Sequence, residues 1–537
     1  MSNKLKNTAR NQENQQSKRL NIQMLLEYAT AAVMLAVCCF VPLYVSNGYY
    51  NIGEDKYAAF RQCMIWGMPV LCLLFIVHLI WNRKELQRPQ MSATDIFVVL
   101  FLLAVCLSVV CGGFLPNALK GYPGWYMGLL SQVCFALIYL FASREGSFWR
   151  IVLLCMSLVA TVVFVIAVCN RFNVDPLGFY VNLDQIYKEV FVSTLGQISW
   201  YASFWAVCMP IGIGLYIWGH HKLVRIVSVG YLVVILGTLH TVNAESAYLA
   251  FAAVMFVFLL LALDSAKTML RWMIVCDLFL IVARAVSVCM KIWPGTYLHF
   301  DVITNFVRFQ DTIMNCLLIC ALVLTGIVFG CMKKNRWITS AAKTIRRVLI
   351  VLVLIIIGGS IVLIVCNTKG LLPDALTQKL SRISYFVWND DWGNHRGQTW
   401  SLSMRMYMEY PFWNKLFGVG PDCYYAYASR HYADRLYEMF GNQALTNAHN
   451  EWLNMLITTG LFGAISYIGI FVSAMKRFLQ KENRNWFTIA VAGSIISYMA
   501  YNFFCYQQVL CTPFIFMLMG FGMYVVSHGK DASKTCN

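Results

Sequence analysis

The sequence Asn447-Ala448-His449-Asn450 is followed at once by an apolar run from Glu451 to Met475. It closes the one long hydrophilic segment that lies between two apolar stretches, and Arg396 lies upstream in that segment. A histidine where a polar segment enters an apolar span is placed for acid–base chemistry at a membrane surface. Arg396 to Gly463 is therefore the candidate functional segment.

The rest of the 537-residue chain is strongly apolar. It is 59% hydrophobic, with a mean hydropathy of +0.61, and soluble domains are only about half apolar. Apolar runs of about 20 residues recur, each long enough to cross a bilayer as a helix. β-barrel strands would instead give short alternating segments. The sequence predicts an all-α, polytopic membrane protein with about 14 transmembrane helices, at residues 24–45, 62–81, 95–114, 126–143, 149–169, 199–218, 226–243, 246–264, 272–292, 311–331, 348–366, 451–475, 486–504 and 509–527.

Lys and Arg predict the orientation of these spans. They gather in alternate short loops, which the positive-inside rule places in the cytoplasm together with both termini. This clustering accounts for the net charge of +17 without a nucleic-acid partner. The expected organisation is a cytoplasmic basic tail (1–23), a transmembrane bundle of about eleven spans (24–366), a large extracytoplasmic loop (367–448), three C-terminal spans (449–527) and a cytoplasmic tail (528–537).

The large loop is predicted to contain short helices at the membrane surface. A helical pattern occupies part of 371–388, a second helix is predicted over 399–410, and a third, single helix over about 422–440. Arg396, Trp400, Ser403 and Tyr407 fall on one helical face, and Pro411 ends that helix. A glycine-rich turn follows, in which positive φ angles are expected.

These residues resemble the signature of the O-antigen ligase and polymerase family. His449-Asn450, nine residues, and Gly460-Leu461-Phe462-Gly463 resemble the family's His-Asn and Gly-x-x-Gly pair. Upstream, Arg396, Trp400, Pro411 and 416–421 (Leu-Phe-Gly-Val-Gly-Pro) resemble its Arg, Trp, Pro and Gly-Val-Gly-Pro segment. Looser matches lie at 193–200 and at 243–248, where Glu245 stands in the place of an arginine that many members carry.

The resemblance implies a GT-C-like membrane glycosyltransferase of the bacterial plasma (inner) membrane, with its active site on the extracytoplasmic face. Its donor would be a glycan on undecaprenyl pyrophosphate, and its acceptor a lipid, a glycan or a protein. No metal, nucleotide or other cofactor is expected.

Such a transfer needs a base for the acceptor hydroxyl and a cation for the leaving pyrophosphate. Histidine titrates near neutral pH, so His449 is the candidate base. Arginine makes bidentate contacts to phosphate, so Arg396 is the first candidate ligand. Asn450 either caps the helix that starts at Glu451 or contacts substrate. Trp400 is a further candidate glycan contact.

Three other arginines are candidate pyrophosphate ligands. Arg284 lies inside a predicted span, where a charge usually faces a wet cavity or a partner. Its alternative role is an ion pair with Asp277 or with an acid on another span. Arg308 and Arg405 are predicted on the outer side, and the alternative for Arg405 is an exposed pair with Glu409.

Other functions remain open from the sequence. A ligase moves a finished glycan and a polymerase joins repeat units, and the signature does not separate the two. A metal-dependent protein glycosyltransferase would use an acidic motif in the first outer loop, where Glu54-Asp55 stands. A lipid-linked glycan transporter or flippase is the alternative outside the enzymes.

Overall fold

The fold is a helical membrane bundle, as the sequence predicts. The computed structural model describes residues 22–81, 90–295, 300–333, 341–381 and 383–532. Twelve helices in these ranges are long and apolar enough to cross a membrane. They are Ile22–Leu43, α3 (Ile52–Trp81), α4 (Ala93–Gly112), α7 (Trp149–Arg171), α9 (Ile198–Trp218), α10 (Lys222–Val242), α11 (Glu245–Ala262), α12 (Ala266–Ile292), α14 (Asp311–Lys333), α15 (Ala342–Thr368), α21 (Glu451–Phe478) and α23 (Thr512–Ala532).

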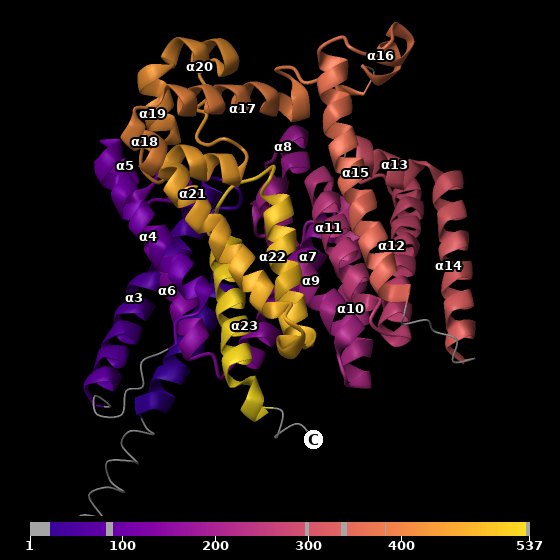
Figure 1. Ribbon diagram of the computed structural model, residues 1–537, viewed down its shortest axis with the longest axis horizontal. Helices are drawn as coiled ribbons and strands as arrows, with labels where there is room; N and C mark the ends of the chain where they lie inside the picture. Colours follow the sequence, from indigo (N-terminus) through magenta and orange to yellow (C-terminus); the bar gives the residue numbers. More distant parts are fainter. Residues whose placement is uncertain (1–21, 82–89, 296–299, 334–340, 382, 533–537) are drawn as a thin grey trace, which may run out of the picture.

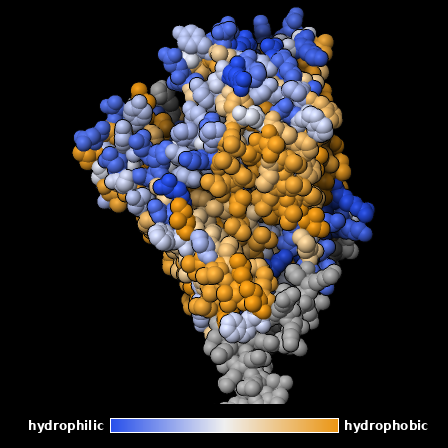
Figure 2. Space-filling model, turned by 90° about the vertical axis from the view of Figure 1, so that its left-hand side faces the viewer, coloured by the Kyte–Doolittle hydropathy of each residue, from blue (hydrophilic) through white to orange (hydrophobic). Residues whose placement is uncertain are grey.

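The spans predicted at 126–143 and 486–504 coincide with two shorter apolar helices, α6 (Leu129–Arg144) and α22 (Trp486–Tyr501). Most of the predicted basic N-terminal tail, and the basic residues Arg83, Lys84 and Arg88, lie outside the described residues. Figure 2 shows a broad apolar band with hydrophilic residues gathered above it, as expected for a protein that crosses a bilayer.

The core of the bundle lies around α9, α21, α22 and α23. In the most apolar window of α9, 78% of the residues are buried, and the value for α21 and α23 is 67%. Pro210 inside α9 and the glycines of α9 lie against α10 and α22, where small side chains allow close helix packing. In contrast, none of the corresponding window of α15 is buried.

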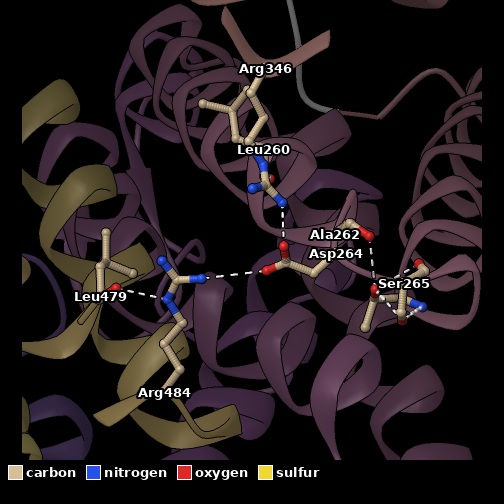
Figure 3. A network of polar contacts seen from close by, with 8 residues as sticks. Leu260, Ala262, Asp264, Ser265, Arg346, Leu479 and Arg484 are labelled. Carbon is tan, nitrogen blue, oxygen red and sulfur yellow. Dashed lines mark hydrogen bonds and ion pairs between the residues drawn. The ribbon is translucent and has the colours of Figure 1, made fainter. Parts of the chain in front are cut away.

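Polar contacts hold α15 at the end where it begins (Figure 3). Asp264, just after α11, accepts a hydrogen bond from Arg346 of α15. Its second carboxylate oxygen lies 3.4 Å from Nη1 of Arg484, which precedes α22. Nε of Arg346 also donates to the carbonyl oxygen of Leu260 over 2.6 Å. One carboxylate therefore connects three helix ends.

The residues between α15 and α21 form short helices at the opposite end of the bundle (Figure 1). We call this the α16–α20 segment (residues 369–450). Its elements are α16 (Asp374–Leu380), η3 (Ser384–Phe386), α17 (Trp392–Glu409), α18 (Phe412–Phe417), α19 (Tyr424–His431) and α20 (Ala433–Phe440). The single helix predicted over 422–440 is wrong: at Tyr432 the backbone leaves the helical region, so α19 and α20 are separate.

The remaining elements are short. They are α5 (Leu115–Lys120), α8 (Gln185–Val190), α13 (Val302–Phe309), η4 (Lys481–Asn483) and the strands β1 (Phe191–Val192) and β2 (Gly196–Gln197), with a π-helical turn η1 (Ala36–Phe40) and α2 (Val41–Leu43) at the end of the first helix. The two strands pair antiparallel, with Phe191 opposite Gln197, and they lead directly into α9.

The glycines of the candidate functional segment bring α18 against α21. Gly460 kinks α21 with φ 68° and ψ −175°, a conformation that is nearly exclusive to glycine. At this kink the carbonyl oxygen of Thr458 accepts hydrogen bonds from the N–H groups of Val419 (3.1 Å) and Gly420 (2.9 Å). A Cβ on Gly418 would lie 2.2 Å from the same oxygen. Gly418 and Gly460 therefore allow the backbones of α18 and α21 to approach closely.

Candidate functional site

His449 lies in the turn immediately before α21, and its backbone is held on both sides. Its φ of +48° is unusual for a residue other than glycine. Its N–H donates to Oδ1 of Asn447 over 2.9 Å. Next to it, Oδ1 of Asn450 accepts from the N–H of Leu453 over 3.0 Å and caps α21. The capping role predicted for Asn450 is confirmed, and the two asparagines hold the backbone of the turn that carries His449.

The imidazole of His449 is half-buried and packs edge-on against Tyr506, with ring centroids 5.4 Å apart. Burial, and then the positive charge of Arg396, lowers the pKa of His449 to about 4. Since a charged imidazole is disfavoured there, His449 is neutral at neutral pH. A neutral imidazole can accept a proton.

Arg396, in α17, contacts the turn that carries Tyr506. Its Nη2 donates to the carbonyl oxygen of Phe504 over 3.0 Å, and its Nη1 donates to that of Gly393 over 2.7 Å. The guanidinium lies over the Phe504 ring, 5.6 Å from the centroid. Its Nε is buried and has no hydrogen-bond partner among the described residues. Arg396 and His449 therefore both contact the turn formed by residues 502–511, between α22 and α23.

Trp400, one helical turn after Arg396, packs against Phe503 and Phe504 of this turn. Its ring stacks on Phe504 with centroids 6.1 Å apart and meets Phe503 edge-on at 5.5 Å. Trp392 packs on its other side at 5.4 Å. These rings form an apolar wall beside Arg396.

A shallow pocket lies beside the His449 turn, and its cavity volume is about 20 Å³. It shares two residues with the surroundings of His449: Asn447, which accepts from the His449 N–H, and Tyr506, which contacts the imidazole. No Lys, Arg or His is among its lining residues. They are Phe101, Trp125, Met127, Gln132, Pro421, Asp422, Asn447, Asn454, Met455, Thr458, Thr459, Tyr506 and Gln507.

Asp422 is the one carboxylate in this lining. Its Oδ2 accepts hydrogen bonds from the N–H groups of Tyr122 (2.6 Å) and Met127 (2.9 Å), in the loop before α6. Burial raises the pKa of Asp422 to about 6, against the lowering effect of these two hydrogen bonds. Asp422 thereby ties the glycine-rich turn to the 122–127 loop.

Glu451, the first residue of α21, lies at the centre of a buried hydrogen-bond network. Its carboxylate accepts from the hydroxyl of Tyr498 (2.8 Å), from the hydroxyl of Tyr467 and from the amide of Asn502. Gln507 donates to the Tyr467 hydroxyl over 2.8 Å, and Gln132 donates to Gln507 over 2.7 Å. The network therefore runs from the start of α21 to two amides of the pocket.

The other candidate arginines have different surroundings. Arg284 of α12 forms an ion pair with Asp311, at the start of α14, over 2.6 Å. Its partner is therefore an acid on another span, which was one of the two ion pairs that the sequence left open. Arg308 is buried, and its Nε donates to the carbonyl oxygen of His240 over 2.7 Å. Both belong to the α12–α14 group of helices.

Arg405 lies further along α17 and is exposed. It lines a separate surface pocket with Asp390 and Arg435. Glu409, its expected partner, instead accepts a hydrogen bond from Tyr432, and the described residues contain no Arg405–Glu409 ion pair. The structure thus brings together His449, Arg396, Asn450 and Trp400, and places the other three arginines elsewhere.

Sequence reasoning missed several residues of this site. Tyr506 and Gln507 lie in the short loop predicted between the spans 486–504 and 509–527. Asp422 follows the glycine-rich turn, and Glu451 is an acid at the start of a span. The available signal was polar residues in an apolar context, which are expensive in a membrane and usually functional or paired. The described residues contain no group of three His, Cys, Asp or Glu side chains placed to hold a metal ion.

Fold and site together define a multi-span membrane protein with a polar site, containing one histidine and one arginine, at one end of its bundle. Residues 316–468 match the family model described as O-antigen ligase, and this range contains Arg396, Trp400, His449 and the Gly460 kink. The resemblance found in the sequence is confirmed over this range, which carries an O-antigen ligase domain. No curated protein and no solved structure matches the chain.

Proposed function

We propose that the chain is a glycosyltransferase that moves a glycan from an undecaprenyl-pyrophosphate donor to an acceptor hydroxyl, in the manner of an O-antigen ligase. The observation that carries the proposal is the arrangement of His449 and Arg396 around one turn within the O-antigen ligase domain. The turn holds a neutral base close to a permanent cation.

The chemistry follows from these two groups. The neutral imidazole of His449 takes the proton of the acceptor hydroxyl as its oxygen bonds to the anomeric carbon. The bond from that carbon to the pyrophosphate oxygen breaks, and the guanidinium of Arg396 stabilises the charge that develops on the leaving group. When the donor's negative charge approaches Arg396, it also offsets the charge that lowers the pKa of His449, so the base becomes stronger as the donor binds. The donor is already activated, so the proposed reaction needs neither ATP nor a metal.

The proposed location is a bacterial plasma membrane, with both termini in the cytoplasm and the site on the extracytoplasmic face. The basic loops of the sequence support this orientation. The α16–α20 segment and the site lie at the same end of the bundle (Figure 1), which fits a membrane-delivered donor and an acceptor that approaches from outside the lipid.

The experiment is a surface-glycan profile of the native host carrying wild type, His449→Ala or His431→Ala, with the lipid-linked pool extracted in parallel and protein levels checked by blot. His431 is the matched control, because it lies in the same segment but is exposed and packs on Tyr427. We expect His449→Ala alone to lose surface glycan while lipid-linked glycan accumulates. An unchanged surface glycan in an expressed His449→Ala variant contradicts the proposal.

The accumulated species separates the remaining functions. Full-length lipid-linked chains indicate a ligase, whereas single lipid-linked repeats indicate a polymerase. Movement of lipid-linked glycan across liposomes without transfer would establish a transporter instead.

A further inference from the structure

The end of the bundle opposite the α16–α20 segment contains two neighbouring arginines on different helices. Arg225 lies near the start of α10 and Arg271 near the start of α12, and both helices begin at that end (Figure 1). Both side chains are half-buried. The charged group that acts on Arg271 is Arg225, which carries a like charge. Neither arginine takes part in an ion pair with a carboxylate of the described residues.

The hydrogen bonds of the two guanidiniums leave donors available. Nη1 of Arg271 donates to the carbonyl oxygen of Ile217, near the end of α9, over 2.7 Å. Nε of Arg225 is buried and has no hydrogen-bond partner among the described residues. Both arginine charges also act on the hydroxyl of Tyr216 in α9, so the two side chains come together beside this residue. Because buried N–H groups normally have an acceptor, this pair of cations suits an anionic ligand.

The acids nearest to Arg271 in the chain do not supply that anion. Asp264, which precedes α12, pairs with Arg346 and Arg484 (Figure 3). Asp277 is buried further along α12, on another face of the helix. Neither α10 nor α12 has an acidic residue in its first turn. Two like charges held together without a counter-ion are unfavourable, so we expect the counter-ion to come from outside the chain.

The surroundings place this pair of arginines at the level of the lipid headgroups. Trp218 is the last residue of α9, and tryptophan gathers at membrane interfaces. Next to Arg225, the apolar side chains of Leu223, Ile226 and Val227 are exposed, and on a membrane-spanning helix such residues face lipid. An acyl chain can pack along them, whereas a free phosphate ion gains nothing from them. The apolar neighbours therefore favour a phosphate that belongs to a lipid.

We propose that Arg225 and Arg271 bind the phosphate of an anionic phospholipid, whose acyl chains pack against the exposed side of α10. Arginine makes bidentate, charge-assisted hydrogen bonds to phosphate, and basic sites between membrane helices bind anionic headgroups. The lipid joins α10 to α12 at the end of the bundle opposite His449. The inference goes beyond the proposed function and does not depend on it, because no residue of the candidate functional site takes part.

The test is native mass spectrometry of the full chain in detergent micelles, with dioleoyl phosphatidylglycerol as the probe. The variants are Arg225→Gln, Arg271→Gln and the double variant. Arg150→Gln is the matched control, because Arg150 is exposed at the start of α7, at the same end of the bundle. Dioleoyl phosphatidylcholine and inorganic phosphate are the comparison probes. Thermal melting identifies any variant that does not fold, and each single variant is a separate test of the site.

We expect wild type and the control to bind phosphatidylglycerol equally, and the apparent Kd to rise about fivefold in each single variant, which is the usual contribution of one arginine to binding anionic lipid. The double variant should lose less than the product of the two single losses, because both arginines contact one phosphate.

Three results would overturn the proposal. Unchanged binding in a folded single variant would show that its arginine does not contact the lipid. A loss in Arg150→Gln as large as in the other variants would show a general attraction to a basic surface instead of a site. Equal binding of phosphatidylcholine, or displacement of the lipid by inorganic phosphate, would exclude an anionic phospholipid as the ligand.

Discussion

Nη2 of Arg396 donates a hydrogen bond to the carbonyl oxygen of Phe504 over 3.0 Å. This contact ties α17 to the 502–511 turn, and Tyr506 of the same turn packs against His449. The candidate base and the candidate phosphate ligand are far apart in sequence, yet one turn sets the position of both. A substitution of Arg396 should therefore change the pKa of His449.

The first prediction concerns the charge of Arg396. Arg396→Gln removes a positive charge near His449, so the pKa of His449 should rise from about 4 towards its ordinary value of about 6.5. Because catalysis needs the neutral imidazole, the acid limb of any residual activity should move to higher pH. The measurement is a pH titration by NMR with ¹³C-labelled histidine, and the His449 signal is assigned by its loss in His449→Asn.

Arg405→Gln is the control for this titration, because Arg405 lies on the same helix but is exposed and lines a different pocket. It should leave the His449 titration unchanged. A His449 pKa that stays the same or falls in Arg396→Gln would show that the two side chains are not coupled.

The second prediction concerns the kink in α21. Gly460→Ala places a Cβ 2.4 Å from the carbonyl carbon of Leu416, at a φ of +68°. The backbone strain alone should cost about 1–3 kcal/mol, and separation of α18 from α21 should add to it. The melting temperature in detergent should fall by several degrees. Gly358→Ala in α15, where no atom lies within 4 Å of the added methyl, should melt at or above the wild-type temperature, and equal melting of the two variants would refute the steric argument.

The third prediction concerns the buried Glu451. Glu451→Gln replaces an acceptor oxygen with an NH₂ group that faces the donors of Tyr498 and Asn502. One donor is then left without an acceptor, which should cost about 1–3 kcal/mol. Thermal melting should show the loss, while Glu438→Gln on the exposed side of α20 should have little effect. A Glu451→Gln protein as stable as wild type would mean that the network does not stabilise the start of α21.

The fourth prediction concerns Arg284 and Asp311. Arg284→Glu places two acids together on α12 and α14, where Asp311 of the wild type pairs with Arg284 at 2.6 Å and also with Lys291, so the variant should melt lower than wild type. Adding Asp311→Arg restores opposite charges between α12 and α14 and should recover part of the stability and also the glycan transfer; Lys291→Gln is added to both variants, because Lys291 also pairs with Asp311 and would repel the new arginine. Recovery of stability without transfer would instead identify Arg284 as a substrate ligand.

Local patterns in the sequence were sufficient for the fold class and for proposing His449 and Arg396 as the centre of the candidate site. Apolar runs of span length predicted the helices, because a bilayer requires about 20 apolar residues for each crossing. The spacing from His449-Asn450 to Gly460 carried the family resemblance. The capping role of Asn450 was also predictable, because a cap depends only on residues within one helical turn.

The break at Tyr432 and the partners of the charged residues were not predictable in this way. Arg284 had two possible kinds of partner in the sequence, and only packing of α12 on α14 shows that it is Asp311. The contribution of Tyr506 and Gln507 was invisible for the same reason: nothing local places a short loop between two spans beside a histidine some sixty residues earlier.

The sequence alone thus determined that the chain crosses a membrane many times and that His449 and Arg396 are its candidate reactive residues, since these follow from periodicity and residue chemistry. Only the tertiary structure decided what surrounds them: the 502–511 turn that positions both, the pocket with Asp422, and the network around Glu451. Such neighbours come from helices distant in the chain. Their proximity is set by the packing of the whole bundle, which no single stretch of sequence encodes.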